Sequence, residues 1–224
     1  MESSTNTTDN RRLPLRERKK LRTRRALTNT ALELFTEKGF AATTLDELVD
    51  RVDISKRTFF RYFASKEDVA IATEAEFWEA YIDEVHDRDV QGQLLTFLKE
   101  TLLTTLRSMD QDWDRRFFQT RKIVAYASSS VLYDYSELAS LRAQRQLIDV
   151  LGDKIGIDSR EDVRFRMLGE FVLGAWRCGA SNWVAGRGAG AQGIRGHGGR
   201  DMLIRRVEEA FDAIPKTLSL TAPG

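Results

Sequence analysis

Hydrophobic residues recur at helical spacing through most of this chain, and the most regular stretch lies between residues 43 and 69. Two apolar stripes run along it, the first formed by Leu45, Leu48, Val49 and Val52 and the second by Ile54, Phe59 and Phe63. Spacings of three and four residues predict amphipathic helices. We therefore expect two short helices over about 45–52 and 56–62, joined by a tight turn, with Phe59 and Phe63 in the core.

Helix-start signals accompany these stripes. Thr44 is followed by Glu47 three residues later, and Ser65 by Asp68 at the same spacing, whereas the middle helix has Ser55 alone. A hydroxyl N-cap with an acid at the third helical position satisfies backbone amides and suits the positive end of the helix dipole. Two short helices joined by a tight turn are typical of a helix-turn-helix, which offers its second helix to the major groove of DNA.

The rest of the chain also has helical periodicity. We expect further helices over about 16–38, 65–87, 91–108, 113–127, 134–152, 160–186 and 200–213. Strand-length alternation of Val, Ile and Thr is absent from the sequence, which has three prolines. An all-α fold is therefore predicted, with a helical bundle after the head. The expected division is a disordered tail at 1–13, a head at 14–66, a ligand-binding and dimerisation domain at 67–215 and a flexible C-terminus at 216–224.

The segment 160–186 is apolar on two faces. The first carries Phe165, Leu168, Val172, Ala175, Trp176, Gly179 and Trp183, and the second carries Met167, Gly174, Cys178, Ser181 and Ala185. The second face is lined with small residues. A helix with two apolar faces is either central to a bundle or lies between the core and a subunit interface, and we favour the interface.

The formal net charge of +1 hides a difference between the two ends of the chain. Residues 1–67 carry 15 Lys and Arg against 10 Asp and Glu, whereas the remaining residues carry 20 against 24. Nine basic side chains and one acid fall within residues 11–25. Alone, such a segment fits a solvated tail as well as a polyanion site, but its place directly before a helix-turn-helix favours phosphate contacts.

Other classes of protein are not indicated. No apolar run approaches the roughly 18–20 residues of a membrane span, and the first twelve residues lack the apolar core of a secretory signal. A single cysteine, Cys178, fits a reducing cytoplasm, and we expect it to be buried packing rather than a redox sensor. His86 and His197 stand apart from any ligand-spaced cluster, so we expect no metal, no cofactor and no enzymatic activity.

A glycine-rich motif at residues 188–193, GAGAQG, matches the spacing of a dinucleotide-binding loop. That motif requires a strand before it and a helix immediately after it. A predicted helix precedes it here, and seven glycines fall within residues 186–199. We therefore expect a flexible loop between the last two helices.

Residues 24–69 resemble the DNA-binding head of the TetR/AcrR family of transcriptional regulators. The family pattern is an amphipathic helix ending in LF-x-x-x-G, then TT, a short apolar helix, a turn, S-x-x-T, two aromatics and YF-x-SKE. In the same order this chain has Leu34-Phe35, Gly39, Thr43-Thr44, Leu48, Ser55, Thr58, Phe59-Phe60, Tyr62-Phe63 and Ser65-Lys66-Glu67. The resemblance covers about a fifth of the chain, and the remainder is similar to the family in helical content and length.

Two positions depart from the family pattern. The usual turn glycine is Asp53 here, which tolerates a left-handed backbone at some cost. The second aromatic residue of the recognition helix is Phe60 rather than the frequent tyrosine. Phe60 has no hydroxyl to donate to a phosphate, so its contact with DNA would be apolar, for instance with a thymine methyl.

The resemblance implies a set of DNA contacts. Thr44 and Lys66 are expected to meet phosphates at helix N-termini, and Arg22, Arg24 and Arg25 to supply phosphate contacts or a minor-groove arm. The recognition helix contributes Ser55, Lys56, Arg57, Thr58, Phe60, Arg61 and Tyr62. Arg57 is the preferred base reader, because a guanidinium can form two hydrogen bonds with guanine; a phosphate contact alone is the alternative.

Family members are homodimers whose C-terminal domain binds a small molecule. The resemblance thus implies a cytoplasmic repressor that a mainly apolar or aromatic effector releases from double-stranded operator DNA. Candidate effector-binding residues, each more often ordinary core, are Phe97, Trp113, Phe117, Tyr126 and Trp176. Two alternatives remain: an activator or architectural DNA binder without a ligand, and a small-molecule-binding or enzymatic protein with a vestigial head.

Overall fold

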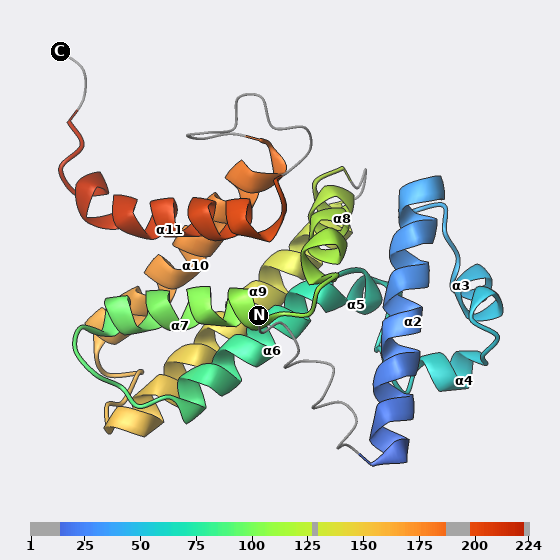
Figure 1. Ribbon diagram of the computed structural model, residues 1–224, viewed down its shortest axis with the longest axis horizontal. Helices are drawn as coiled ribbons and strands as arrows, with labels where there is room; N and C mark the ends of the chain where they lie inside the picture. Colours follow the sequence, from blue (N-terminus) through green and yellow to red (C-terminus); the bar gives the residue numbers. More distant parts are fainter. Residues whose placement is uncertain (1–13, 127–129, 187–197, 222–224) are drawn as a thin grey trace, which may run out of the picture. The chain divides into compact units, whose positions relative to one another are not determined.

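The computed structural model describes residues 14–126, 130–186 and 198–221. These residues form ten α-helices, α2 to α11, which are labelled in Figure 1. The described residues contain no strand, which confirms the all-α fold class. The chain divides into two units, one formed by residues 1–75 with 110–136 and the other by residues 76–109 with 137–224. The domain boundaries expected from the sequence, at residues 13, 66 and 215, stay a prediction.

The first unit is organised by one long helix, α2, which contacts α3, α5 and α8. Its helices are α2 (Leu15–Lys38), α3 (Leu45–Arg51), α4 (Lys56–Phe59), α5 (Lys66–Ala70) and α8 (Trp113–Tyr126), with the first residues of α6 and α9. The core side chains, each at most 2% exposed, include Leu27, Ala31, Leu48, Phe59 and Phe63. The prediction that Phe59 and Phe63 are core residues is thereby confirmed.

The second unit contains α10, a helix with one buried face. Its helices are most of α6 (Ala72–Asp87), α7 (Leu94–Ser108), most of α9 (Ser130–Ile155), α10 (Val163–Val184) and α11 (Gly199–Thr217). The ring of Trp176 on α10 stacks on Phe77 of α6, with 4.3 Å between ring centroids. Buried Tyr81 donates its hydroxyl to the carbonyl of Leu98 at 2.9 Å, and burial raises the pKa of Tyr81, so the phenol stays a neutral donor.

The predicted helices differ from the observed ones at two places in the head. The helix expected over 56–62 ends at Phe59, because the amides of Arg61 and Tyr62 bond to carbonyls three residues back, at 3.2 and 2.8 Å. Such tight turns close an α-helix. The helix expected over 65–87 is divided at Ile71, whose carbonyl accepts the amide of Glu74 three residues on.

The helices α10 and α11 approach each other closely at a glycine. A methyl group built on Gly179 would lie 2.6 Å from the Cα of Val207 and 2.8 Å from its backbone nitrogen. Near the end of the pair, the indole of Trp183 donates to the carbonyl of Gly199 at 3.1 Å. Only a residue without a side chain permits this spacing of the two backbones.

The two apolar faces of α10 have different environments. The first face is buried in the unit, with Phe165, Val172, Ala175, Trp176 and Trp183 each at most 4% exposed. The second face is open in the single chain: Met167 is 44% exposed, and Gly174, Cys178, Ser181 and Ala185 are also exposed. The expectation that Cys178 is buried is therefore wrong for the single chain, because it lies on this outer face.

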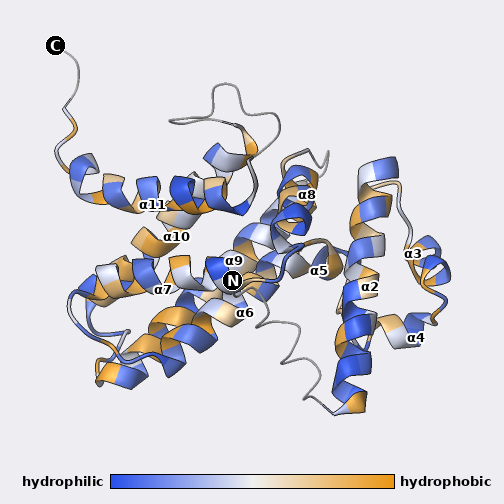
Figure 2. Cartoon of the chain, viewed as in Figure 1, coloured by the Kyte–Doolittle hydropathy of each residue, from blue (hydrophilic) through white to orange (hydrophobic). Residues whose placement is uncertain are grey.

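Figure 2 shows the hydropathy of each residue: the N-terminal part of α2 is largely hydrophilic, whereas α10 carries many apolar residues. None of the described helices combines the length and apolarity that a membrane crossing requires. The glycine motif at 188–193 lies outside the described residues.

Candidate nucleic-acid interface

The turn between α3 and α4 holds the left-handed residue expected there. Asp53 has a φ of 54°, and its amide donates to the carbonyl of Asp50 at 3.1 Å. The next amide, of Ile54, reaches the carbonyl of Val49 at 3.0 Å. An aspartate thus performs the function of the usual glycine, as expected, and two hydrogen bonds fix the angle at which α4 leaves α3.

All three expected helix caps are formed. The Thr44 side chain accepts the Glu47 amide at 3.2 Å while the Glu47 carboxylate accepts the Thr44 amide at 3.0 Å, which completes a capping box. Ser55 accepts the amide of Thr58 at 3.1 Å and also bonds to its hydroxyl at 3.0 Å. Ser65 accepts the amide of Asp68 at 3.1 Å. These bonds give α3, α4 and α5 defined starting points on the head.

The cap of α3 contains a carboxylate with a lowered pKa. The pKa of Glu47 is lowered from 4.5 to about 2, first by its hydrogen bond with Lys38 and then by the Thr44 amide. A lowered pKa stabilises the folded state above the unfolded value of 4.5, and this contribution is lost as the pH falls toward 2. We expect Glu47→Gln to be less stable than the wild type at pH 7 and to approach it between pH 4.5 and 2, in thermal unfolding followed by circular dichroism. A stability difference that is independent of pH would contradict this assignment.

The recognition helix buries one aromatic residue and exposes its neighbour. Phe59 is fully buried, whereas Phe60 is 54% exposed and meets Phe59 edge to face. Exposed on the same short segment are Ser55, Lys56, Arg57 and Arg61, while Thr58 and Tyr62 are half-buried. The local fold therefore presents three cations and one apolar ring together, which is the residue chemistry that contacts phosphates, guanine and thymine methyl groups.

One cation of the recognition helix has a protein partner. The ammonium of Lys56 lies 2.7 Å from the carboxylate of Asp46 on α3, and both side chains are more than half exposed. Exposed ion pairs contribute roughly 0–1 kcal/mol. Lys56 can therefore exchange this carboxylate for a phosphate with little loss of stability.

Lys66 contributes to the structure of the head as well as being a predicted phosphate contact. Its ammonium donates to the carbonyls of Phe40 and Thr43 at 2.8 and 2.9 Å, and lies 4.3 Å from the centroid of the Phe40 ring. An ammonium has three donors, so two of them fasten the start of α5 to the α2–α3 loop. A phosphate contact would use the third.

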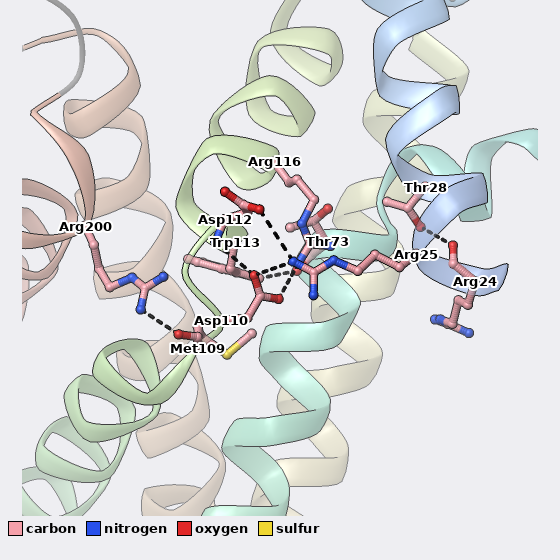
Figure 3. Close-up of polar contacts among 10 residues, drawn as sticks. All are labelled: Arg24, Arg25, Thr28, Thr73, Met109, Asp110, Asp112, Trp113, Arg116 and Arg200. Atoms are coloured by element: carbon pink, nitrogen blue, oxygen red, sulfur yellow. Dashed lines mark hydrogen bonds and ion pairs between the residues drawn. The ribbon is translucent and has the colours of Figure 1, made fainter. Parts of the chain in front are cut away.

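The three arginines predicted on α2 have different surroundings. Arg22 is exposed. Arg24 is half-buried, and its guanidinium lies 3.4 Å from the carbonyl of Tyr62 and 4.9 Å from the centroid of the Phe63 ring. Arg25 pairs with Asp110 at 3.0 Å and Asp112 at 3.8 Å (Figure 3). Arg24 thus holds the end of the recognition segment, and Arg25 is directed at the residues that precede α8.

Four of the five aromatic residues proposed to bind an effector are buried within the two units. Trp113 and Phe117 stack in the first unit, with 4.7 Å between centroids, and both are fully buried. Phe97 and Trp176 are buried in the second unit. Tyr126 is the last residue of α8, and its side chain lies outside the described part of the structure.

The second unit has a hollow of about 1030 Å³ lined by apolar and charged side chains, most of them from α7 and α11. Its lining includes Leu103, Phe171, Phe211, Arg107 and Lys99 and includes none of the five proposed aromatics. Lys99 crosses from α7 to Asp212 of α11 at 2.6 Å. Sequence reasoning missed the hollow because helix periodicity does not show which two helices diverge at the surface.

The buried arginine Arg116 was also missed. It is 1% exposed and lies 2.6 Å from Asp110. The Asp-Gln-Asp sequence of residues 110–112 marks a helix start, but nothing in the sequence pairs it with Arg25, 85 positions earlier. Among the described residues, no group of His, Cys, Asp and Glu could hold a metal ion.

Comparisons with known proteins agree with this geometry. A family model described as bacterial regulatory proteins, tetR family, matches residues 27–73. TcmR of Streptomyces glaucescens, an HTH-type transcriptional regulator, is 46% identical over 68 residues, which are 30% of this chain and 30% of that protein. The matched region therefore spans less than a third of the relative.

Two solved structures share the fold over most of the chain. A TetR-family transcriptional regulator from Syntrophomonas wolfei has a TM-score of 0.56 at 16% identity, covering 92% of this chain and 100% of that one. FadR of Thermus thermophilus, a TetR-family repressor in complex with lauroyl-CoA, has a TM-score of 0.52 at 21% identity, covering 90% and 99%. At these identities the likeness concerns the fold.

Proposed function

Since the head of this chain, residues 27–73, belongs to the TetR family of bacterial regulatory proteins, we propose that the protein is a ligand-responsive transcriptional regulator. It acts in the cytoplasm as a homodimer on double-stranded operator DNA. It represses transcription until a small, mainly apolar or aromatic effector releases it. The observation that carries this proposal is the exposed set Lys56, Arg57, Phe60 and Arg61 on a segment held by the buried Phe59.

The proposed DNA contacts follow from this surface. Arg57 reads a base and Phe60 meets an apolar edge in the major groove, because both are exposed on the recognition segment. Contacts to phosphates come from Thr44, Ser55, Lys56, Thr58, Arg61, Tyr62, Lys66, Arg22 and Arg24. These contacts provide salt-dependent affinity, whereas Arg57 and Phe60 provide sequence preference.

The outer face of α10 supports the proposal of a homodimer. Its residues are small, and no atom lies within 4 Å of a methyl group built on Gly174. This face therefore leaves room for a second helix to approach closely. A two-fold interface uses the same face of both subunits. Met167, 44% exposed, would then be covered by the partner subunit.

The hollow between α7 and α11 is the better candidate for the effector, because Phe97, Trp113, Phe117 and Trp176 are already buried against protein. Its lining combines apolar Leu103, Phe171 and Phe211 with charged Arg107 and Lys99. A ligand with an apolar body and a polar end would match this lining. The FadR relative, which shares the fold, was solved with lauroyl-CoA.

The experiment that tests the function is selection of bound sequences from a random double-stranded DNA library with the full chain. Affinities for the selected and a scrambled sequence are then measured by fluorescence anisotropy at two salt concentrations. We expect an inverted repeat whose half-sites lie about one helical turn, ~34 Å, apart, because each head of a dimer reads one half-site. Binding should weaken strongly with added salt.

Other outcomes would support the alternatives. Equal, salt-sensitive affinity for selected and scrambled DNA would indicate an architectural binder. Failure to bind any DNA would indicate a vestigial head. A selected site without two-fold symmetry would contradict the homodimer.

A further inference from the structure

We propose that the hollow in the second unit binds an elongated apolar molecule that ends in an anionic group, and that Lys216 holds this group. The proposal names the chemical class of the effector and therefore rests on the proposed function. It depends on the second unit alone, since the residues that line the hollow all belong to 76–109 or 137–224.

The lining of the hollow follows the length of two antiparallel helices. Lys99 in the middle of α7 lies 2.6 Å from Asp212 of α11. At the end of α7, the carbonyl of Arg107 lies 3.4 Å from the guanidinium of Arg200 in the first turn of α11. The lining residues of α7 extend from Leu95 to Arg107, which is about 18 Å along a helix at ~1.5 Å per residue. A ligand of extended shape fits such a lining better than a compact one.

Apolar side chains line the hollow along this direction. Leu103 and Phe211 are at most 4% exposed, while Leu95, Phe171 and Ile214 are half-buried. An apolar body that lay along the hollow would cover the side chains that are still partly open to water. Removal of apolar surface from water favours binding, as in most small-molecule sites.

The acidic residues of the lining are already paired within the hollow. Asp212 and Glu208 both lie beside the ammonium of Lys99, at 2.6 and 3.7 Å. Glu100 lies 3.8 Å from the guanidinium of Arg88. These ion pairs neutralise the three acids of the lining, so none of them is left to attract a cationic ligand.

The remaining charges of the lining are both positive. In the described part of the chain, the side chains of Arg107 and Lys216 form no ion pair. A charge that lines a hollow and lacks a protein partner is favoured by a ligand of the opposite sign. The lining therefore selects an anionic group rather than a cationic or a neutral one.

Lys216 is the better anchor of these two cations. It lies one turn beyond Asp212, in the direction of the start of α7, whose first turn contains no acidic residue. Arg107 stands at the opposite end of the hollow, on the side of Glu208. Because like charges repel, an anion is more stable beside Lys216 than beside Arg107. An ammonium donates charge-assisted hydrogen bonds to a carboxylate or a phosphate.

The ion pair between Lys99 and Asp212 gives the proposal a second, opposite consequence. Asp212 holds the ammonium of Lys99, which is 22% exposed at the side chain. Without the charge of Asp212, this ammonium becomes available to an anion in the hollow. Two substitutions four positions apart on α11 should therefore change anion affinity in opposite directions.

The test measures binding by the full chain without DNA, by isothermal titration calorimetry at low salt. The probes share one length of alkyl chain and differ in the head group: decanoate, decyl phosphate, 1-decanol and decyltrimethylammonium, each below its micelle concentration. We expect both anions to bind about fivefold more tightly than 1-decanol, the upper end for an exposed ion pair. The cation should bind most weakly. The ratio of the two anions identifies a carboxylate or a phosphate as the preferred head group.

Two variants on α11 test the anchor. Lys216→Gln should weaken binding of both anions about fivefold and leave 1-decanol unchanged, because it removes a charge alone. Asp212→Asn should strengthen binding of both anions, because it removes the nearer of the two acids from Lys99. Both substituted positions are exposed, so neither variant should affect folding.

Two further variants act as controls. Arg205→Gln removes the same charge as Lys216→Gln from an exposed position of α11 outside the lining, and should change no affinity. Ile214→Ala removes part of the apolar lining and should weaken binding of the anions and of 1-decanol alike. Together they separate the charge of Lys216 from the general charge of the helix and from apolar contact.

Several results would overturn the proposal. Equal affinities of the wild type for the anions and for 1-decanol would remove the preference for an anionic group. A Lys216→Gln variant that weakened all probes alike would show that Lys216 does not hold that group. Absence of binding by every probe would remove the site itself. Weaker anion binding by Asp212→Asn would contradict the part assigned to Lys99.

The proposed function is decided by a separate measurement, the release of the selected operator. Anions that bind in the hollow without releasing the operator would support the site and contradict its role for the effector. Specific, salt-sensitive operator binding by a chain that binds none of the probes would support the DNA-binding function and overturn the site.

Discussion

Replacing Gly179 with alanine is expected to destabilise the protein by about 1–3 kcal/mol, the usual range for overpacking a well-packed core. The new methyl group would lie 2.6 Å from the Cα of Val207 and 2.8 Å from its nitrogen. These are backbone atoms, which no side-chain rotation can remove, so α10 and α11 must separate. Urea denaturation of the variant and the wild type at equal protein concentration measures the change in the free energy of unfolding.

Gly174→Ala is the matched control on the same helix. No atom lies within 4 Å of its added methyl group in the single chain, so the ordinary preference of a helix for alanine is expected to stabilise it by about 0.5–1 kcal/mol. Gly174 also lies on the proposed dimer face, so the measurement is repeated at several protein concentrations. Similar effects of the two substitutions would show that the close approach at Val207 does not determine the stability of the helix pair.

Arg57→Ala is expected to weaken binding to the selected operator by about 1–3 kcal/mol and to relax base preference at one position of each half-site. Arg57 is exposed on a segment whose other side is anchored by the buried Phe59. A guanidinium in that position can form two hydrogen bonds with a guanine. Repeated selection with the variant protein, followed by anisotropy with the original operator and with scrambled DNA, measures both effects.

Arg22→Ala serves as the comparison, because Arg22 is exposed on α2 and is proposed to meet phosphate. Arg22→Ala should weaken binding to all DNA sequences alike and should lower the slope of log affinity against log salt concentration by about one unit. If Arg57→Ala also weakened binding to the operator and to scrambled DNA equally, Arg57 would be a phosphate contact and another residue would read the base.

The sequence determined the local structure of the head. The caps at Thr44, Ser55 and Ser65 form as expected, because a hydroxyl and the amide it satisfies are only three residues apart. Asp53 adopts the left-handed conformation that its position requires. The exposure of Phe60 beside the buried Phe59 follows from helical spacing. These features depend on interactions within a few residues, which a sequence pattern records directly.

The sequence also determined which face of α10 is buried: six of the seven residues expected on that face are buried, and Leu168 is half-buried. It did not determine the length of α4, since helix propensity continues beyond Phe59 while the backbone tightens into short turns. Nor did it locate the hollow. Four of the aromatic residues that were expected to bind an effector are buried, and two of them, Trp113 and Phe117, stack on each other.

The tertiary structure alone decided the partners of the charged residues. Arg25 belongs by sequence to a basic segment, yet its guanidinium pairs with Asp110, 85 positions away. Lys66 fastens the α2–α3 loop, and Arg200 holds the end of α7. Long side chains have many rotamers and can reach any element that folding brings near. Hydrophobic spacing therefore specifies the helices and their buried faces, whereas the pairing of charges is specified only when the helices have packed.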